Sequence, residues 1–413
     1  MNGRCVSKQQ TAVSSKQKRQ RRRFWLPLTA YRLMLSAFLA LSAAGCSTLT
    51  HTYPQRLMDA GQPGKPPLDD GYTDYAGVIH IHTTYSHDAQ GRFEDVVRVA
   101  NAQHLDYVIV TEHNNLKPLQ EGLQGWHGTT LVLIGTEIST RDGHYLALHV
   151  TKEIDREQLT TQQIIDAVNQ QGGFGFIAHP YFKHSRWRDW SVHGFTGIEI
   201  YNMAHDALDE NRLRLVLWTL TTPAEPFYFS ILDRPYDPLR TWDGLIQQRG
   251  QMVGIGSADA HEFHVMGIKF APYEDLFQLV RTHILVPTDT PLTPDRVYEA
   301  LRQGHAYVGV NLIGNPKGFA FMADDGQRVL GVMGDLVTFM PHLQLTAVLP
   351  APAQLTLFKD GQAIGTFTGA QWRVPVAAPG VYRLEAMRHT KPWIFSNPIY
   401  VRPAPIVADR PSS

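Results

Sequence analysis

The chain has 413 residues, of which 43% are hydrophobic and 18% charged, and this composition excludes a disordered protein or a long coiled coil. The formal net charge is zero, but the first 45 residues hold nine Lys/Arg and no acid, so the remainder has 29 basic and 38 acidic residues, a net charge of −9. An acidic body makes nucleic-acid binding an unexpected function, because the phosphate backbone needs a basic surface.

Residues 1–46 have the features of an export signal. A basic run, Lys16–Arg23, precedes the short apolar stretch Leu33–Leu41, and small residues lead to Cys46. This end resembles a bacterial lipobox, which implies lipidation of Cys46 and a periplasm-facing outer-membrane lipoprotein anchored in the membrane. The alternative is an uncleaved membrane anchor, although the apolar stretch is short for a spanning helix of ~20 residues.

Residues 47–75 are polar and rich in Pro and Gly, which predicts a tether. Between 76 and 312, short apolar runs alternate with helix-like periods, which indicates a largely parallel sheet or barrel. The strands are expected at 78–79, 107–110, 131–134, 145–148, 174–178, 198–200 and 252–255, and the helices at 93–104, 161–171, 208–220 and 293–303.

Residues 313–405 change to period-two alternation, and 406–413 form a short tail. Strands are expected at 343–348, 354–358, 365–368, 371–374 and 380–386. The sequence Lys359-Asp360-Gly361-Gln362 predicts a hairpin turn between two of them. This segment is therefore predicted to be a small antiparallel β-sandwich-like domain.

Seventeen of the nineteen histidines lie between residues 51 and 305, and most of those with chemical interest end an apolar run. The active sites of α/β barrels are built at the carboxyl ends of strands. Cys5 and Cys46 are the only cysteines, so a metal site must use His, Asp and Glu. The candidates at these strand ends are His80, His82, His87, Asp88, His113, Glu137, His144, His179, Asp259 and His261.

Each motif alone is weak, since a single histidine at a strand end is more often a hydrogen-bonded structural residue. Two histidines at i and i+2, as in His80-Ile81-His82, point to the same side of an extended chain. Six such clusters in one domain favour a metal centre.

The ordered motifs His-x-His-Thr, Ser-x-Asp, Thr-Glu-His-Asn, Gly-Thr-Glu, Gly-His, Ala-His-Pro and Ser-Ala-Asp-Ala-His, over residues 76–310, resemble the PHP (polymerase and histidinol phosphatase) superfamily. Residues 198–202 resemble a further segment of that superfamily. Residues 392–400 resemble the end of its CehA/McbA (carbaryl hydrolase-like) branch. The resemblance implies a distorted (β/α)7 barrel that holds two or three divalent ions of Zn, Mn or Fe.

The resemblance also implies a ligand set. His80, His82, Glu137 and Asp259 would hold one metal, and Glu137 would bridge to a second held by His144 and His179. Asp88, His113 and His261 would hold a third, although either His87 or Asp88 could be the ligand, with Asp88 preferred. Glu112 replaces a common Asp and is expected to support a ligand. Catalytic roles fall to Glu137, His179, Asp259 and His261.

The implied reaction is hydrolysis of a small-molecule phosphoester by a hydroxide that bridges the metals. Residues near the ligand motifs could contact the substrate, and they are Arg141, Tyr181, Arg186, Trp187, Arg188 and His205. Three alternatives stay open: an aryl ester or carbamate hydrolase, a non-catalytic metal- or ligand-binding surface lipoprotein, and a function carried by the C-terminal domain through Trp372, Tyr382 or Trp393.

Overall fold

The computed structural model describes residues 69–203, 224–265 and 268–404. Several predicted features lie outside these residues: the export signal with Cys46, most of the tether, His205, the helix at 208–220 and the tail at 406–413. No helix in the described part of the chain is long and apolar enough to cross a membrane.

The central strand of the sheet is β1 (Tyr72–His82), which pairs in parallel with β2 (Tyr107–His113) and antiparallel with β12 (Val280–Pro287). The ladder then continues through β4 (Thr130–Thr140), β5 (Gly143–Leu148), β6 (Phe174–Ile177), β7 (Gly197–Asn202) and β8 (Val253–Ser257). The short strand β9 (Ala260–His261) returns to β1, and the sheet is closed. All the strands expected before residue 258 are present.

The sheet is mixed rather than largely parallel, because β5 runs antiparallel to both β4 and β6. The chain turns from β4 directly into β5 through Arg141 and Asp142, with no crossover helix between them. A direct hairpin necessarily makes its two strands antiparallel.

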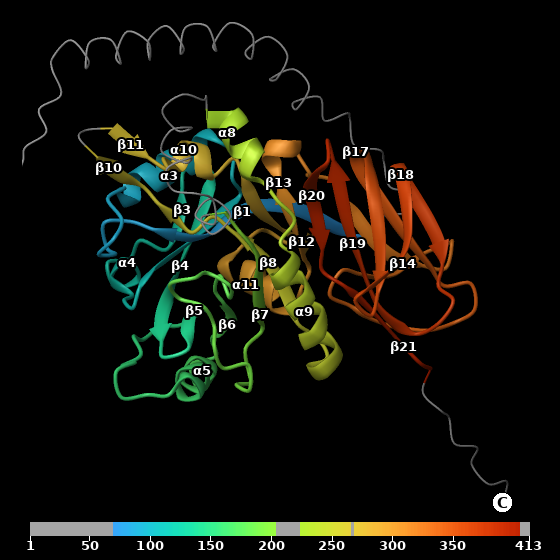
Figure 1. Cartoon of the computed structure of the whole chain (residues 1–413), viewed down its shortest axis with the longest axis horizontal. Coiled ribbons are helices and arrows are strands. Elements are labelled where there is room, and N and C mark those ends of the chain that lie inside the picture. The colour runs from blue at the N-terminus through green and yellow to red at the C-terminus, as the bar shows by residue number, and fades with distance from the viewer. Residues whose placement is uncertain (1–68, 204–223, 266–267, 405–413) are drawn as a thin grey trace, which may run out of the picture. The chain divides into compact units, whose positions relative to one another are not determined.

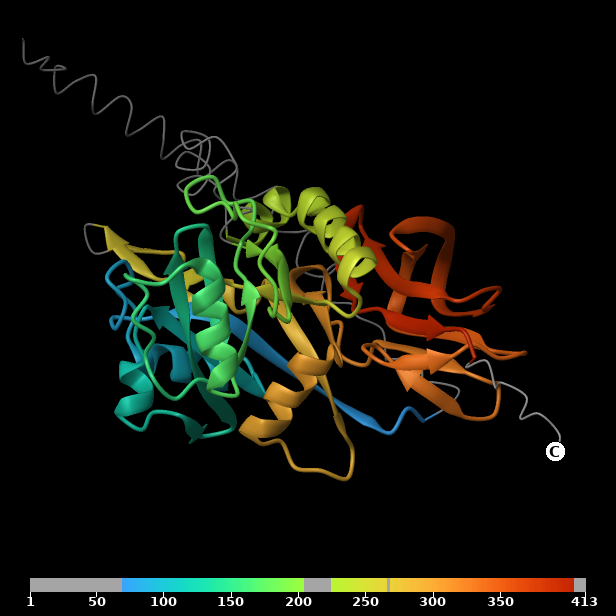
Figure 2. The same cartoon turned by 90° about the horizontal axis from the view of Figure 1, so that it is seen from below.

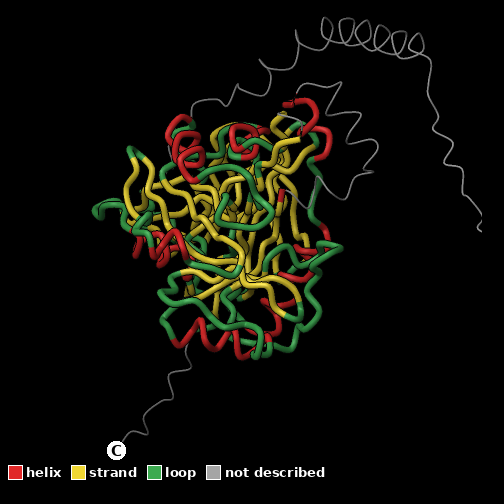
Figure 3. Tube along the Cα trace, turned by 90° about the vertical axis from the view of Figure 1, so that its left-hand side faces the viewer, coloured by secondary structure: helices red, strands yellow, loops and turns green. Residues whose placement is uncertain are grey.

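Helices pack outside the strands, as Figure 3 shows. They are α3 (Phe93–Ala102), α4 (Lys117–Gln120), α5 (Thr161–Gln170), α8 (Ala224–Ile231), α9 (Tyr236–Arg249), α10 (Tyr273–Leu276) and α11 (Pro294–Gln303). Local sequence sets the ends of two of them. Thr160 and Gln163 form a capping box at the start of α5. The helix α11 begins at Pro294, and Gly304, with a left-handed φ of 77°, caps it after Gln303.

Alternate residues of the barrel strands reach two different cores. In β2, Val108 and Val110 join one buried cluster, while Tyr107 and Ile109 join a second cluster that also contains Val297 and Leu301 of α11. Such strands are buried on both faces, which explains their continuous apolar runs. With both faces filled by apolar side chains, the polar residues of these strands gather at the strand ends.

After β13 (Ala306–Val310) and a single 3₁₀ turn at Asn311–Ile313, the chain is nearly all β. The strands are β14 (Ala320–Asp324), β15 (Val329–Val332), β16 (Leu336–Thr338), β17 (Gln344–Lys359), β18 (Gln362–Pro375), β19 (Gly380–Arg388), β20 (Lys391–Ser396) and β21 (Ile399–Arg402). Figure 1 shows them gathered beside β13, and Figure 2 shows α9 running next to them.

The predicted hairpin turn is confirmed. Lys359 pairs with Gln362, and the two residues between them have left-handed φ values, 52° at Asp360 and 78° at Gly361. Two positive φ values in a two-residue loop match the twist of antiparallel strands. The four strands expected around this turn merge into the long strands β17 and β18, with a register shift between Val348 and Ala353.

The sheet continues across the predicted domain boundary at 312/313, because β13 pairs with β20 from Tyr307–Ser396 to Gly309–Ile394. Separate domains for residues 76–312 and 313–405 stay a prediction. The aromatic residues considered for a binding role in the second segment pack inside it: Tyr382 and Trp393 are buried, and Trp372 packs on Phe367 at 4.2 Å between ring centroids.

We expect Trp393→Ala to lower the free energy of unfolding by about 3–5 kcal/mol. The side chain is fully buried, and its indole N–H donates to the carbonyl of Gly314 at 2.8 Å. Urea denaturation followed by circular dichroism measures the change. Trp126→Ala is the matched control, because Trp126 is 55% exposed and should cost under about 1 kcal/mol. Equal losses in the two variants would contradict this assignment of the core.

Candidate metal centre

The predicted ligands come from seven places along the chain and meet at one edge of the barrel sheet. Eight of the nine form groups of three whose ligand atoms lie within 4.8 Å of one another. The four groups are His82–His113–His261, His80–His179–Asp259, His80–His82–Glu137 and His113–Glu137–His144. Residues up to 181 positions apart in sequence are therefore brought together because their strands end at the same edge.

Glu137 of β4 lies at the centre of this cluster and is 1% exposed. The two oxygens of its carboxylate face different histidines. Oε2 lies 3.2 Å from His80 Nε2, 3.3 Å from His82 Nε2 and 3.1 Å from His113 Nδ1, whereas Oε1 lies 2.7 Å from His144 Nδ1 and 2.9 Å from His179 Nε2. A carboxylate placed in this way can serve two adjacent cations, one on each oxygen.

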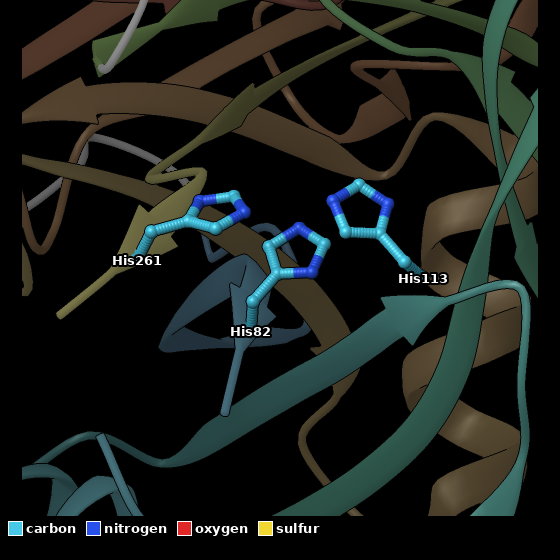
Figure 4. A group of neighbouring side chains, drawn as sticks. All are labelled: His82, His113 and His261. Atoms are coloured by element: carbon cyan, nitrogen blue, oxygen red, sulfur yellow. The ribbon is translucent and has the colours of Figure 1, made fainter. Parts of the chain in front are cut away.

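Three imidazole rings form a stack at one side of the cluster (Figure 4). The ring of His82 lies between those of His113 and His261, with centroids 4.3 Å and 4.0 Å away and interplanar angles of 27° and 22°. A stack of this kind brings several nitrogen donors close together. Burial and the neighbouring ring of His261 also lower the pKa of His82, because like charges at this distance repel.

The structure distinguishes Asp88 from His87 by position. Asp88 Oδ2 lies 3.1 Å from His113 Nε2, and its Oδ1 lies 3.6 Å from His261 Nε2. The side chain of His87 is 79% exposed, and its Nε2 lies 3.8 Å from Asp88. Asp88 belongs to none of the four groups, so it lies at the border of the cluster. The geometry favours Asp88 over His87 as a ligand.

Buried carboxyl and hydroxyl groups orient the histidines from behind. Glu199 Oε1 accepts a hydrogen bond from His80 Nδ1 at 2.7 Å, and Ser86 Oγ accepts one from His82 Nδ1 at 3.2 Å. Ser86 in turn donates to Glu112 at 2.5 Å. These bonds direct Nε2 of each ring into the cluster, where it offers a lone pair once the ring is neutral. Glu112 thus supports a ligand indirectly, in the place the sequence predicts for it.

Glu199 is the functional residue that the sequence reasoning missed. It is 1% exposed and also accepts from the backbone N–H of His179 at 2.7 Å and from Asn202 Nδ2 at 2.9 Å. Its signal in the sequence is a lone acid inside the apolar strand Ile198-Glu199-Ile200. A buried acid in such a place needs a specific partner.

The donor set fits a metal ion on a direct observation. The buried atoms His80 Nε2, His82 Nε2 and His113 Nδ1 have no hydrogen-bond partner among the described residues. Leaving a buried polar nitrogen without a partner costs about 1–3 kcal/mol. Neutral imidazole and carboxylate are ligands that suit Zn, Mn and Fe. The group could therefore bind metal.

The electrostatics of the cluster point the same way. Burial raises the pKa of Glu137, but the surrounding histidines, His80 first, outweigh burial and hold that pKa well below its usual value. Burial likewise lowers the pKa of His80, yet Asp259, Glu199 and Glu137 raise it well above its usual value. Burial and His261 lower the pKa of His82 to about 3. The centre is thus an ionised carboxylate site that attracts a positive charge.

Three cluster residues have backbone conformations that side chains rarely adopt. The φ angles are 67° at His80, 24° at His179 and 47° at Asp259. The β1–β2 register shifts between Ile79 and Ile81, around the first of them. Positive φ costs free energy at a non-glycine residue, and such residues concentrate at functional sites, where surrounding contacts hold them.

A cavity of about 550 Å³ opens beside the cluster, and only some of the residues predicted to contact the substrate line it. Tyr181 and Arg186 line it together with His179. Arg141 is exposed in the β4–β5 turn and does not line this cavity. Trp187 is buried, with its indole N–H on the carbonyl of Asp189, and Arg188 is exposed. Neither lines the cavity, so Tyr181 and Arg186 remain the best placed of the described candidates.

Comparison with known proteins identifies the barrel segment. Residues 79–281 match the PHP domain. An uncharacterized protein of Methanocaldococcus jannaschii is 27% identical over 143 residues, which are 31% of this chain and 81% of that protein.

Two solved structures have low similarity to this chain. A two-domain protein of Bacteroides vulgatus, described as containing a predicted PHP-like metal-dependent phosphoesterase, has a TM-score of 0.42 and 16% identity over 82% of this chain and 98% of its own. PsfC of Pseudomonas syringae has a TM-score of 0.39 and 14% identity, over 57% and 91% of the two chains. The match to the PHP domain over residues 79–281 spans all the cluster residues from His80 to His261.

Proposed function

We propose that the protein is a divalent-metal-dependent hydrolase that acts on small-molecule phosphoesters. The observation that carries the proposal is the buried carboxylate of Glu137, which faces five histidines from two sides. The PHP domain over residues 79–281 supports it. The cavity beside the cluster, lined by Arg186 and Tyr181, supports a small-molecule substrate.

The cluster would hold two or three ions of Zn, Mn or Fe. His80, His82, Glu137 and Asp259 would bind one, and Glu137, His144 and His179 a second. A third would use the set Asp88, His113 and His261. When bound, such ions polarise a phosphoryl oxygen and make water a nucleophile at neutral pH.

The chain's own residues supply orientation and charge. Glu199 and Ser86 hold His80 and His82 in the tautomer that leaves Nε2 free. Arg186 stacks over the ring of Tyr181 at 5.3 Å, and its guanidinium suits a bidentate grip on phosphate oxygens. The side chains of His144 and His261 are 24% and 23% exposed, which makes them the most exposed histidines of the cluster.

An assay panel separates this proposal from its alternatives. Activity on p-nitrophenyl phosphate but not on p-nitrophenyl acetate or an aryl carbamate would support the proposed hydrolysis of phosphoesters. The reverse pattern would support the ester or carbamate hydrolase. Tight metal uptake with no turnover on any of them would support a non-catalytic metal-binding protein.

Glu137→Gln should remove bound metal more completely than any other single substitution, because one side chain faces both halves of the cluster. The amide keeps the shape but loses the charge that the histidines stabilise. Metal content of the purified chain by inductively coupled plasma mass spectrometry measures the loss, together with hydrolysis of p-nitrophenyl phosphate.

The matched control is Asp324→Asn, a buried carboxylate of β14 that bonds Thr346 at 2.6 Å, outside the cluster. It should keep its metal. Retention of the full metal content by Glu137→Gln would contradict the proposed centre.

Glu199→Gln should weaken metal binding about 10- to 100-fold without removing any proposed ligand. The change takes the negative charge from the group that accepts the His80 proton. Competition against a chelator of known affinity measures the constant. Unchanged affinity would show that Glu199 does not orient His80.

We also propose that Cys46 is lipidated and that the protein faces the periplasm from the outer membrane. The support is the sequence alone: a basic segment, a short apolar stretch and Ala43-Ala44-Gly45 before the cysteine. Growth with labelled palmitate should label the protein and not its Cys46→Ala variant. A labelled Cys46→Ala variant would contradict the assignment.

A further inference from the structure

The cavity beside the metal centre has two walls of different origin. On the side of the cluster it is lined by His179, Glu199 and Asn202. Residues 233–238, here called the outer wall, line its other side. The outer wall consists of the end of the link from α8 to α9 and the first residues of α9.

The outer wall is tied to the C-terminal strand β19 by charged side chains. Arg234 donates from Nε to Glu385 Oε2 at 2.6 Å and from Nη2 to Oε1 at 2.7 Å. Arg383 donates to the same Oε1 at 2.6 Å and also, with two nitrogens at 2.7 Å and 2.6 Å, to Asp243 of α9. The result is a continuous chain of four charges from the outer wall through β19 and back to α9.

The two middle members of this chain of charges are buried, which makes the chain costly to break. Glu385 is 3% exposed and Arg383 is 2% exposed. Removing one partner of a buried ion pair leaves an uncompensated charge, so the geometry of the pair is strongly fixed. A second attachment comes from Lys391 of β20, which donates to the carbonyl of Leu232 at 2.7 Å.

The outer wall presents a large aromatic side chain that is not buried. Tyr236 is 64% exposed, yet its ring is held against the guanidinium of Arg234 at 4.7 Å. Among the five exposed large apolar or aromatic side chains of the described residues, it alone lines this cavity. An exposed ring that is fixed in place can contact a ligand without losing much conformational freedom.

We infer that the C-terminal strands β19 and β20 help to build the substrate site from behind: Glu385 and Lys391 position the outer wall, and Tyr236 on that wall binds the organic group of the substrate. The inference rests on the proposed function for the phosphate end, which the metal centre and Arg186 would bind. The substrate class is then a phosphoester whose organic group is large enough to reach Tyr236, rather than a small alkyl phosphate. Glu385 and Lys391 are positioning residues, since their attachment acts through the wall.

Binding tests this without turnover. The whole chain, loaded with Mn, is titrated in a calorimeter with phenylphosphonate and with methylphosphonate, two non-hydrolysable probes that differ in the organic group. The quantity compared is the affinity for phenylphosphonate divided by the affinity for methylphosphonate. We expect the wild type to prefer phenylphosphonate and Tyr236→Ala to lower the ratio about 3- to 10-fold.

The positioning role is tested by two variants of Glu385. Glu385→Gln should lower the ratio at least about threefold. Glu385→Asp keeps the charge and should lower the ratio less than Glu385→Gln does. Lys391→Met is a second variant in case Glu385→Gln does not fold, as judged by its melting temperature. Asp324→Asn, which changes a buried carboxylate of β14 that accepts a hydrogen bond from Thr346, should leave the ratio at the wild-type value.

An unchanged ratio in Tyr236→Ala, or in every folded attachment variant, would overturn the inference, as would a wild type that binds neither probe. Hydrolysis is a separate readout. A chain that shows the expected ratios but cleaves no phosphoester would contradict the proposed function and leave the role of β19 and β20 supported.

Discussion

The arrangement of the whole site depends on one buried carboxylate. Glu137 has almost no contact with solvent, and five imidazoles surround its two oxygens at 2.7–3.3 Å. An isolated charge in such a place would be prohibitively unstable. The strands β1, β2, β5 and β6 must therefore end in register with β4, so that their histidines compensate that charge. The register of the strands therefore determines which residues make up the site.

Much of this centre could be predicted from the sequence, because a ligand-type residue directly after an apolar run can be placed at the end of a strand. The motif His80-Ile81-His82 and the isolated Glu137 and His179 each follow an apolar run, and parallel strands end at a common edge. The turn at Asp360-Gly361 was equally readable, since few residues tolerate two positive φ values. Signals of this kind are local, and local chemistry suffices to interpret them.

The features that could not be predicted are those set by long-range pairing. Glu199 acquires its role only when β7 lies next to His80, 119 residues away. The antiparallel orientation of β5 follows from a turn too short for a helix, and the apolar pattern of β5 is the same for either direction. The pairing of β13 with β20 has no periodic signature in the sequence, so the continuity of the sheet across residues 312 and 313 could not be predicted.

That ladder has a consequence for how the molecule is assembled. Asn397 accepts from the backbone N–H of Gly254 at 2.8 Å and donates to the carbonyls of Gly254 and Ala306 at 2.9 Å. Gly254 lies on β8, the strand that leads to Asp259. One edge of the barrel is thus completed by residues near the end of the chain, a contact of high sequence separation that forms slowly. The strand that leads to Asp259 is therefore held in place by a residue 143 positions later in the sequence, so the last part of the cluster is fixed only once the C-terminal segment has folded against β8.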